Sequence, residues 1–229
     1  MNSSGKITDI FFDLDHTLYD FEANAKATFE DAFQKYNVVL SRDFMEVFTP
    51  INDAYWQKLT HNQVSRETLR YGRLKDSFDV LGVSVDDETI YAISDYFIKN
   101  LSTKGKVFPG TFEILDYLQP KYQLHLITNG PEEVQQQKLE VTNLKPYFKT
   151  MTTSEKAGVK KPYPEIFEFA LKSAQTQAHQ SVMIGDNLEA DIEGAISAGF
   201  EAVFFNEKKI ANPKNFVEIY HLEQIKNIL

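Results

Sequence analysis

The chain has 229 residues with 24 basic and 33 acidic side chains, and its formal net charge of −9, without any run of Lys and Arg, excludes a nucleic acid polymer as the expected partner. It contains no cysteine, which excludes disulfides, thiolate metal sites and a catalytic thiol. Hydrophobic residues make up 42% and charged residues 25%, close to the average for globular proteins, so we expect a substantial buried core.

The N-terminal residues 1–9 do not resemble a secretory signal, because Asp9 interrupts the sequence before a long apolar region can form. No apolar stretch approaches the roughly 20 residues that are needed to span a bilayer. We therefore expect a cytoplasmic protein that does not bind membranes.

The first predicted element is a short buried strand over 7–12, which is apolar on balance and ends at two acidic residues. Asp13 and Asp15 are two positions apart, so an extended backbone would direct both carboxylates into the same cleft. There, one carboxylate could attack phosphorus while the other moves protons. An Asp-rich turn or helix cap is the alternative. The same alternation directs His16 away from Asp15, and we expect it to take no part.

A helical region follows over 20–100, and the sequence predicts that it forms an insert over 18–106 between two parts of a core, 1–17 and 107–229. Apolar residues recur there at the spacing of one helix face. These residues are Ala25, Phe29, Phe33 and Tyr36, then Leu74, Phe78 and Leu81, and then Ile90, Ile93, Phe97 and Leu101.

Strands and helices alternate from residue 107 onward. Strands are predicted over 124–128, 147–151, 181–184 and 202–205, and helices over 131–141, 165–174 and 189–198. This alternation predicts an α/β fold in which crossover helices connect the strands of a parallel sheet. Ligands of such sheets bind at the carboxyl ends of the strands.

Two later segments have side chains that suit a phosphate group. Thr128-Asn129-Gly130 closes one predicted strand and Pro131 opens a helix, so a hydroxyl and helix N-terminal amides could hold phosphate oxygens. An ordinary Asn-Gly turn is the alternative. The segment Lys160-Lys161-Pro162 offers an ammonium group, for which a solvated surface pair is the alternative.

Two more acids follow another predicted strand. Asp186 comes directly after Ile184-Gly185, and Asp191 lies in the first turn of the next helix. If these strands are neighbours, several carboxylates converge, and two unit charges at 4 Å repel by about 4 kcal/mol at an effective dielectric of about 20. A cation is then required, and oxygen ligands favour magnesium over calcium. An Asp cap at a strand-to-helix turn is the alternative.

The order of these motifs resembles the haloacid dehalogenase superfamily, and the insert resembles its helical cap of the first type. The matching segments are Phe-Asp-Leu-Asp-His-Thr-Leu at 12–18, Ile-Thr-Asn-Gly at 127–130, Lys-Lys-Pro at 160–162, and Gly-Asp-Asn at 185–187 with Asp191. The resemblance implies a Rossmann-like sheet and a magnesium-dependent phosphatase.

Residue roles follow from the resemblance by position. It implies that Asp13 is the nucleophile and a magnesium ligand, that Asp15 is the general acid/base and lends its backbone carbonyl to the metal, and that Asp186 completes the protein ligands. Support from an outer layer is implied for Thr17, Asn187 and Asp191.

The resemblance also implies a phosphate site. Thr128 and the amides of Asn129 and Gly130 would hold the phosphoryl oxygens, and Lys161 would offset the charge of nucleophile and phosphate. Lys160 is the alternative to Lys161.

Asp15 argues against a haloalkanoate dehalogenase, because such enzymes typically lack the second acid. A phosphoglucomutase-type enzyme remains open, and a phospho-accepting receiver-like signalling module is a distant alternative. The segment 15–21, the length of the insert and Ile-Thr-Asn-Gly resemble the pyrimidine-nucleotidase branch, which implies nucleoside 5'-monophosphates as substrates. A sugar-phosphate or broad-range phosphatase is the alternative, and we expect a monomer or homodimer.

The insert is expected to set the substrate, because a lobe that closes over the site touches the part of the substrate that does not react. A flat base could stack there on an aromatic side chain. The candidate aromatics are Phe21, Phe44, Phe48, Tyr55, Trp56, Tyr71 and Phe78, with Arg66, Arg70 and Arg73 among them. Most of these aromatics are expected to form the core of the insert itself.

Overall fold

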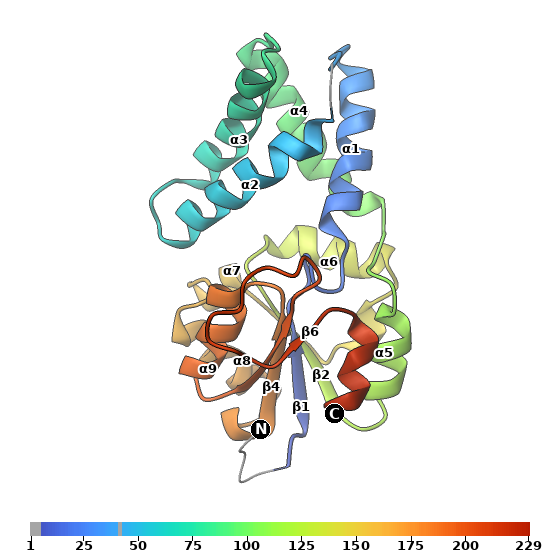
Figure 1. Cartoon of the computed structure of the whole chain (residues 1–229), viewed down its shortest axis with the longest axis vertical. Coiled ribbons are helices and arrows are strands. Elements are labelled where there is room, and N and C mark those ends of the chain that lie inside the picture. Colours follow the sequence, from blue (N-terminus) through green and yellow to red (C-terminus); the bar gives the residue numbers. More distant parts are fainter. Residues whose placement is uncertain (1–5, 41–42) are drawn as a thin grey trace. The chain divides into compact units, whose positions relative to one another are not determined.

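A computed structural model of the chain describes residues 6–40 and 43–229 and separates the chain into two units (Figure 1). One unit combines the N-terminal segment up to Asp20 with Gly105–Leu229, and the other is Phe21–Lys104. Residues 1–5 of the predicted core and 41–42 of the predicted insert lie outside the described residues. Among the described residues, no helix is long and apolar enough to cross a membrane.

The first unit is built on a six-stranded sheet with the order β3-β2-β1-β4-β5-β6. Every neighbouring pair of strands is parallel, which confirms the predicted α/β fold with a Rossmann-like parallel sheet. The strands are β1 (Asp9–Phe12), β2 (Gln123–Thr128), β3 (Thr150–Thr153), β4 (Ser181–Gly185), β5 (Glu201–Phe205) and β6 (Glu218–Ile219).

Helices and short helical turns connect the strands. The α-helices of this unit are α5 (Thr111–Leu118), α6 (Glu132–Val141), α7 (Ser154–Ala157), α8 (Pro164–Ala174) and α9 (Gly194–Ser197). The remaining turns are η2 (Lys145–Tyr147), η3 (Ala178–Gln180), the π-helical η4 (Leu188–Glu193) and η5 (Leu222–Asn227).

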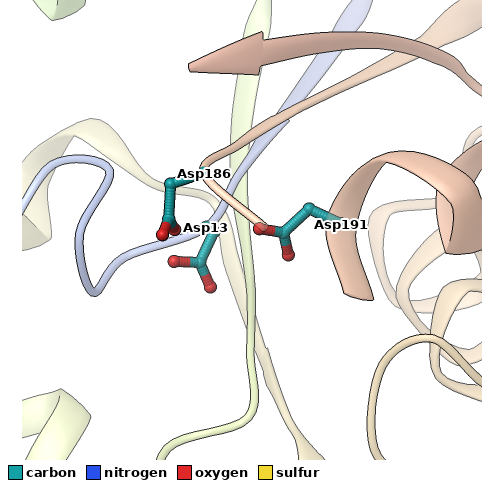
Figure 2. Close-up of side chains that lie close together, drawn as sticks. All are labelled: Asp13, Asp186 and Asp191. Carbon is teal, nitrogen blue, oxygen red and sulfur yellow. The ribbon is translucent and has the colours of Figure 1, made fainter. Parts of the chain in front are cut away.

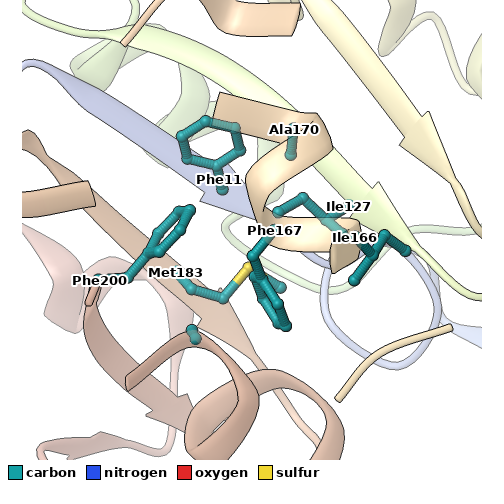
Figure 3. Packing of buried hydrophobic residues seen from close by; sticks show 8 residues of the cluster. Phe11, Ile127, Ile166, Phe167, Ala170, Met183 and Phe200 are labelled. Atoms are coloured by element: carbon teal, nitrogen blue, oxygen red, sulfur yellow. The ribbon is translucent and has the colours of Figure 1, made fainter. Parts of the chain in front are cut away.

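One face of the sheet packs against α8 and α9 through a cluster of buried hydrophobic side chains (Figure 3). Phe11, Ile127 and Met183 come from β1, β2 and β4, and they meet Ile166 and Phe167 of α8. Complete burial of one such side chain contributes about 1.5–3 kcal/mol. This cluster therefore holds the three strands that carry the polar segments in a fixed register.

One predicted element was placed wrongly. The strand predicted over 147–151 is β3 at 150–153, because Pro146 cannot donate to a sheet ladder and 145–147 forms a helical turn instead. The helix predicted over 189–198 begins as the π-helical η4, since the amides of Asp191 and Ile192 both donate to the carbonyl of Asn187. Helix α5 and strand β6 were not predicted.

The described residues of the second unit form four α-helices and a short helical turn. The elements are α1 (Phe21–Lys35), α2 (Phe44–Thr60), α3 (Arg66–Leu81), α4 (Asp87–Asn100) and η1 (Leu101–Thr103). Phe29 forms the centre of its aromatic core, with the ring of Phe97 stacked at 4.3 Å and that of Phe48 edge-on at 4.8 Å between centroids. Phe44 and Phe78 are buried beside them. The expectation that most aromatics of the insert pack into its own core holds for these residues.

Candidate active site

The polar segments leave neighbouring strands at the same edge of the sheet. β1 pairs with β2 on one side and with β4 on the other. Asp13 follows β1, Thr128 ends β2, and Asp186 follows β4. The three segments are far apart in sequence, and the strand order alone brings their side chains together.

Three carboxylates converge at this edge (Figure 2). Asp13, Asp186 and Asp191 each place one carboxylate oxygen within 4.8 Å of the others. Gly185 makes room for this arrangement, because a Cβ atom at that position would collide with the Asp191 carboxylate. Asp13 and Asp191 are buried, and Asp186 is half-buried.

Lys161 lies inside the acid cluster with only 2% of its surface exposed. Its Nζ atom is 2.6 Å from Oδ1 of Asp13, 2.6 Å from Oδ1 of Asp191 and 2.7 Å from the carbonyl oxygen of Ile127. Burial acts to lower the pKa of Lys161, but the carboxylates of Asp13 and Asp191 outweigh it and raise that pKa above its usual value. Lys161, and not the alternative Lys160, therefore supplies the cluster with a permanent positive charge.

The acids themselves are hard to ionise in this setting. Burial raises the pKa of Asp13 to about 7, and the carboxylate of Asp191 adds to the rise while Lys161 opposes it. Burial, together with the charges of Asp13 and Asp191, also raises the pKa of Asp186 well above its usual value. Ionised carboxylates here need more positive charge than Lys161 provides, and an all-oxygen donor set of this kind fits magnesium.

Asp191 differs from the other two acids because both of its oxygens already have partners. Oδ1 pairs with Lys161, and Oδ2 accepts a hydrogen bond from the amide of Asn187 at 3.0 Å. The side-chain oxygen of Asn187 in turn caps η4 by accepting from the amide of Ala190 at 2.8 Å. Asp191 and Asn187 thus fix each other's conformation, and Asp191 orients Lys161.

Thr17 is completely buried and donates from its hydroxyl to Oδ1 of Asp186 at 3.2 Å. The family resemblance implied that Thr17 supports the site from an outer layer. In the structure this hydroxyl orients Asp186.

Asp15 has a separate set of partners. Its two carboxylate oxygens accept hydrogen bonds from Nζ of Lys138 at 2.6 and 2.8 Å, and Oδ2 also accepts from Nε2 of Gln135 at 2.9 Å. Burial acts to raise the pKa of Asp15, but the charge and hydrogen bonds of Lys138 outweigh it and hold that pKa below its usual value. Asp15 is therefore ionised and lies against α6, while Asp13 lies against Lys161.

The backbone after β1 does not stay extended. The amides of Leu18 and Tyr19 both donate to the carbonyl of Leu14, which closes a turn, and His16 has a left-handed φ of 63°. Strand alternation, from which the direction of His16 was predicted, consequently does not apply to it.

Thr128 accepts two hydrogen bonds at its side-chain oxygen, one from Nε2 of Gln135 at 2.7 Å and one from the amide of Gly130 at 3.1 Å. The side chain of Asn129 forms a double bridge to the backbone of Lys161, accepting from its amide at 2.8 Å and donating to its carbonyl at 3.1 Å. The segment after β2 is therefore tied directly to the lysine of the acid cluster.

Gln135 and Lys138 were not predicted as site residues. They lie one turn apart on the buried face of α6, where Lys138 is only 3% exposed and its ammonium sits 4.8 Å from the centre of the Tyr19 ring. A Gln-x-x-Lys pair after the Thr-Asn-Gly segment is a weak signal, because both residue types are common on exposed helix faces. Only the packing of α6 against the turn after β1 identifies them.

Comparison with known proteins identifies the family of the chain. The model of the family described as haloacid dehalogenase-like hydrolase matches residues 10–205, which confirms the resemblance found in the motifs. The solved structure of the HAD-hydrolase YfnB from Bacillus subtilis, bound to magnesium, is similar with a TM-score of 0.88 and 26% identity. That likeness covers 98% of this chain and 99% of the YfnB chain.

Curated relatives of the chain have named activities. The pyrimidine 5'-nucleotidase YjjG of Escherichia coli is 28% identical over 223 residues, which cover 94% of this chain and 96% of the relative. The glyceraldehyde 3-phosphate phosphatase of Methanothermobacter thermautotrophicus is 30% identical over 233 residues, covering 96% and 98%.

Proposed function

The chain belongs to the haloacid dehalogenase-like hydrolase family, and we propose that it is a magnesium-dependent phosphatase that hydrolyses nucleoside 5'-monophosphates through a phosphoryl group carried on Asp13. One observation carries the chemical part of this proposal. A buried lysine, Lys161, contacts Asp13 at 2.6 Å inside a cluster of three carboxylates at the edge of a parallel sheet. This arrangement suits a carboxylate nucleophile that meets a phosphate dianion.

Magnesium would be held by the carboxylates of Asp13 and Asp186 and the backbone carbonyl of Asp15, with Asp191 behind them. When bound, the ion would neutralise the phosphoryl oxygens and keep the Asp13 carboxylate ionised. Lys161 supplies a second, permanent charge at the same place and holds one oxygen of Asp13 in position. The hydroxyl of Thr128 would also contact the phosphoryl group.

The reaction would proceed in two displacements at phosphorus. A carboxylate oxygen of Asp13 attacks and the ester P–O bond breaks. Asp15, which Lys138 keeps ionised in the free protein, must first take up a proton, and it then gives this proton to the leaving alkoxide. Asp15 then takes a proton from water, whose oxygen attacks the same phosphorus and releases phosphate from Asp13. Lys138 stabilises the ionised Asp15 that this second step requires.

The nucleotide part of the proposal rests on the similarity to the pyrimidine 5'-nucleotidase YjjG. The helical unit also has aromatic side chains that are not fully buried in its core. These are Tyr55, Trp56 and Tyr71, which are only partly buried. A nucleobase stacked on such a ring would gain a favourable contact that a sugar phosphate lacks.

A sugar-phosphate phosphatase is the second candidate, because the archaeal glyceraldehyde 3-phosphate phosphatase is similar over nearly the whole chain. A phosphoglucomutase-type reaction uses the same two acids, and it would return the phosphoryl group from Asp13 to a second hydroxyl of the sugar instead of to water.

One assay distinguishes these candidates. Phosphate release from pyrimidine and purine nucleoside 5'-monophosphates, glyceraldehyde 3-phosphate and hexose phosphates would be measured with magnesium and with a chelator. We expect the highest kcat/KM for a pyrimidine nucleotide, no release with the chelator, and no turnover by a folded Asp13→Asn variant. A sugar phosphate that clearly exceeds every nucleotide would overturn the substrate assignment, and normal turnover by Asp13→Asn would overturn the nucleophile.

A further inference from the structure

Gln135 is completely buried in α6 and lies between two residues of the proposed machinery. Its Nε2 atom is 2.9 Å from Oδ2 of Asp15 and 2.7 Å from Oγ1 of Thr128. The orientation of the amide group follows from chemistry, because the reverse orientation would place its carbonyl oxygen against the Asp15 carboxylate. Each of the two amide hydrogens therefore has its own acceptor, one on the acid/base and one on the phosphate-binding hydroxyl.

The consequence for Thr128 concerns the direction of its hydroxyl hydrogen. A hydroxyl oxygen has two acceptor positions and one hydrogen to donate. Gln135 Nε2 and the amide of Gly130 fill both acceptor positions. The hydrogen must point away from these two donors, and it is left to donate to another acceptor.

We propose that Gln135 is a positioning residue that sets the Thr128 hydroxyl as a hydrogen-bond donor to the phosphoryl group and aligns Asp15 beside it. This inference rests on the proposed phosphatase function and extends it to a residue outside the four motifs. Gln135 itself does not touch the substrate. It acts by orienting the hydroxyl and the carboxylate that do.

Two further features of the side chain support this role. The segment after β2 is shaped around it, because a Cβ atom at Gly130 would lie 2.6 Å from both Cδ and Nε2 of Gln135. In addition, Oε1 of Gln135 is buried and has no hydrogen-bond partner among the described residues. Leaving a buried acceptor unpaired is unfavourable, and an apolar side chain of similar length would avoid it. The two N–H donors of the side chain therefore explain why this position is a glutamine, and a contribution to the stability of the fold does not.

The test uses Gln135→Met, which keeps the length of the side chain and removes both donors, in the wild-type and Thr128→Val backgrounds. The matched control is Gln136→Met on the exposed face of the same helix, where the side-chain amide of Gln136 donates to Glu132 at 2.7 Å. Three quantities are measured for each protein: kcat and KM for its best phosphomonoester, the affinity for inorganic phosphate with magnesium by calorimetry, and the thermal midpoint.

We expect Gln135→Met to lower kcat and phosphate affinity roughly tenfold, the size of one lost hydrogen bond of this kind, without lowering the thermal midpoint. In the Thr128→Val background the same substitution should cost less phosphate affinity, because the hydroxyl that it orients is absent. Gln136→Met should behave as wild type.

The possible failures can be told apart. If the wild-type protein hydrolyses no phosphomonoester, the proposed function fails, and phosphate affinity still decides the role of Gln135. If the wild type is active and Gln135→Met retains its kcat and phosphate affinity, the positioning role is wrong while the phosphatase function stands. An equal loss in both backgrounds, or a loss that follows a lowered thermal midpoint, would reduce Gln135 to a structural residue.

Discussion

The Nζ atom of Lys161 lies 2.6 Å from Oδ1 of Asp13, and both side chains are almost fully buried. The two residues are 148 positions apart in the chain and meet only when β1 and the segment after α7 are both in place. This ion pair therefore belongs to the stability of the fold as well as to the proposed reaction.

Lys161→Met should destabilise the protein strongly. Removal of the ammonium leaves Asp13 and Asp191 buried without their cation, and breaking one partner of a buried pair typically lowers the free energy of unfolding by about 3–5 kcal/mol. Urea unfolding in the absence of magnesium measures this change. Lys160→Met is the neighbouring control and should unfold nearly as the wild type does. A Lys161→Met protein with wild-type stability would contradict the assignment of this charge.

Lys138→Met should move the pH profile of the reaction. Lys138 holds the pKa of Asp15 below its usual value, so its loss lets that pKa rise. Because Asp15 must be ionised to accept a proton from water in the second displacement, which contributes to kcat and not to kcat/KM, the acid limb of kcat should shift to higher pH. The profile is recorded at saturating magnesium, with Lys138→Arg as the variant that keeps the charge. An acid limb at the same pH in Lys138→Met and wild type would exclude this link.

Magnesium binding should weaken as the pH falls below about 7. The pKa of Asp13 is raised to about 7 and that of Asp186 is also raised, so protons compete with the metal for these oxygens. Affinity should fall by up to about tenfold per pH unit for each displaced proton. Without magnesium, the raised pKa of Asp13 contributes stability at acidic pH that is lost as the pH rises through about 7. Magnesium titrations at pH 6 and 8 with equal affinities would refute this.

Thr17→Val should reduce magnesium affinity more than it changes KM. The substitution keeps the shape of the buried side chain but removes the hydrogen bond to Asp186. Loss of such an outer hydrogen bond typically weakens metal binding about 10–100-fold. Thr17→Ser retains the hydroxyl and should bind magnesium nearly as well as the wild type. Metal titration of turnover measures both variants, and unchanged affinity in Thr17→Val would mean that the hydroxyl does not orient this ligand.

Much of the fold follows from local sequence patterns. β1, β2, β4 and β5 are short apolar runs with polar residues after them, and their order with the intervening helices predicts a parallel sheet. The patterns predict a helical region that includes α2 but do not mark α2 itself, which has Pro50 inside it. They miss β6, a two-residue strand that exists only because β5 offers an edge to pair with.

The candidate site likewise has one part that the local sequence predicts and one part that it does not. Asp13, Thr128 and Asp186 stand next to predicted strand ends, so their approach to one another could be expected from the sequence. Lys161 follows α7, and only the resemblance of Lys-Lys-Pro to a family motif placed it with them. The contacts of Asp15 could not be expected from the sequence. Gln135 and Lys138 bind it from a helix more than 100 residues away, and nothing in their local sequence separates a buried glutamine or lysine from a solvated one.

The ionised acid cluster also has a definite net charge. With Asp13, Asp186 and Asp191 ionised and Lys161 protonated, two negative charges remain uncompensated, while the charge of Asp15 is matched separately by Lys138. A monovalent cation would leave one charge buried, and a trivalent one would overshoot. We therefore expect the arrangement of side chains to select cations by charge before size, so that sodium or potassium should not replace a divalent ion even at high concentration.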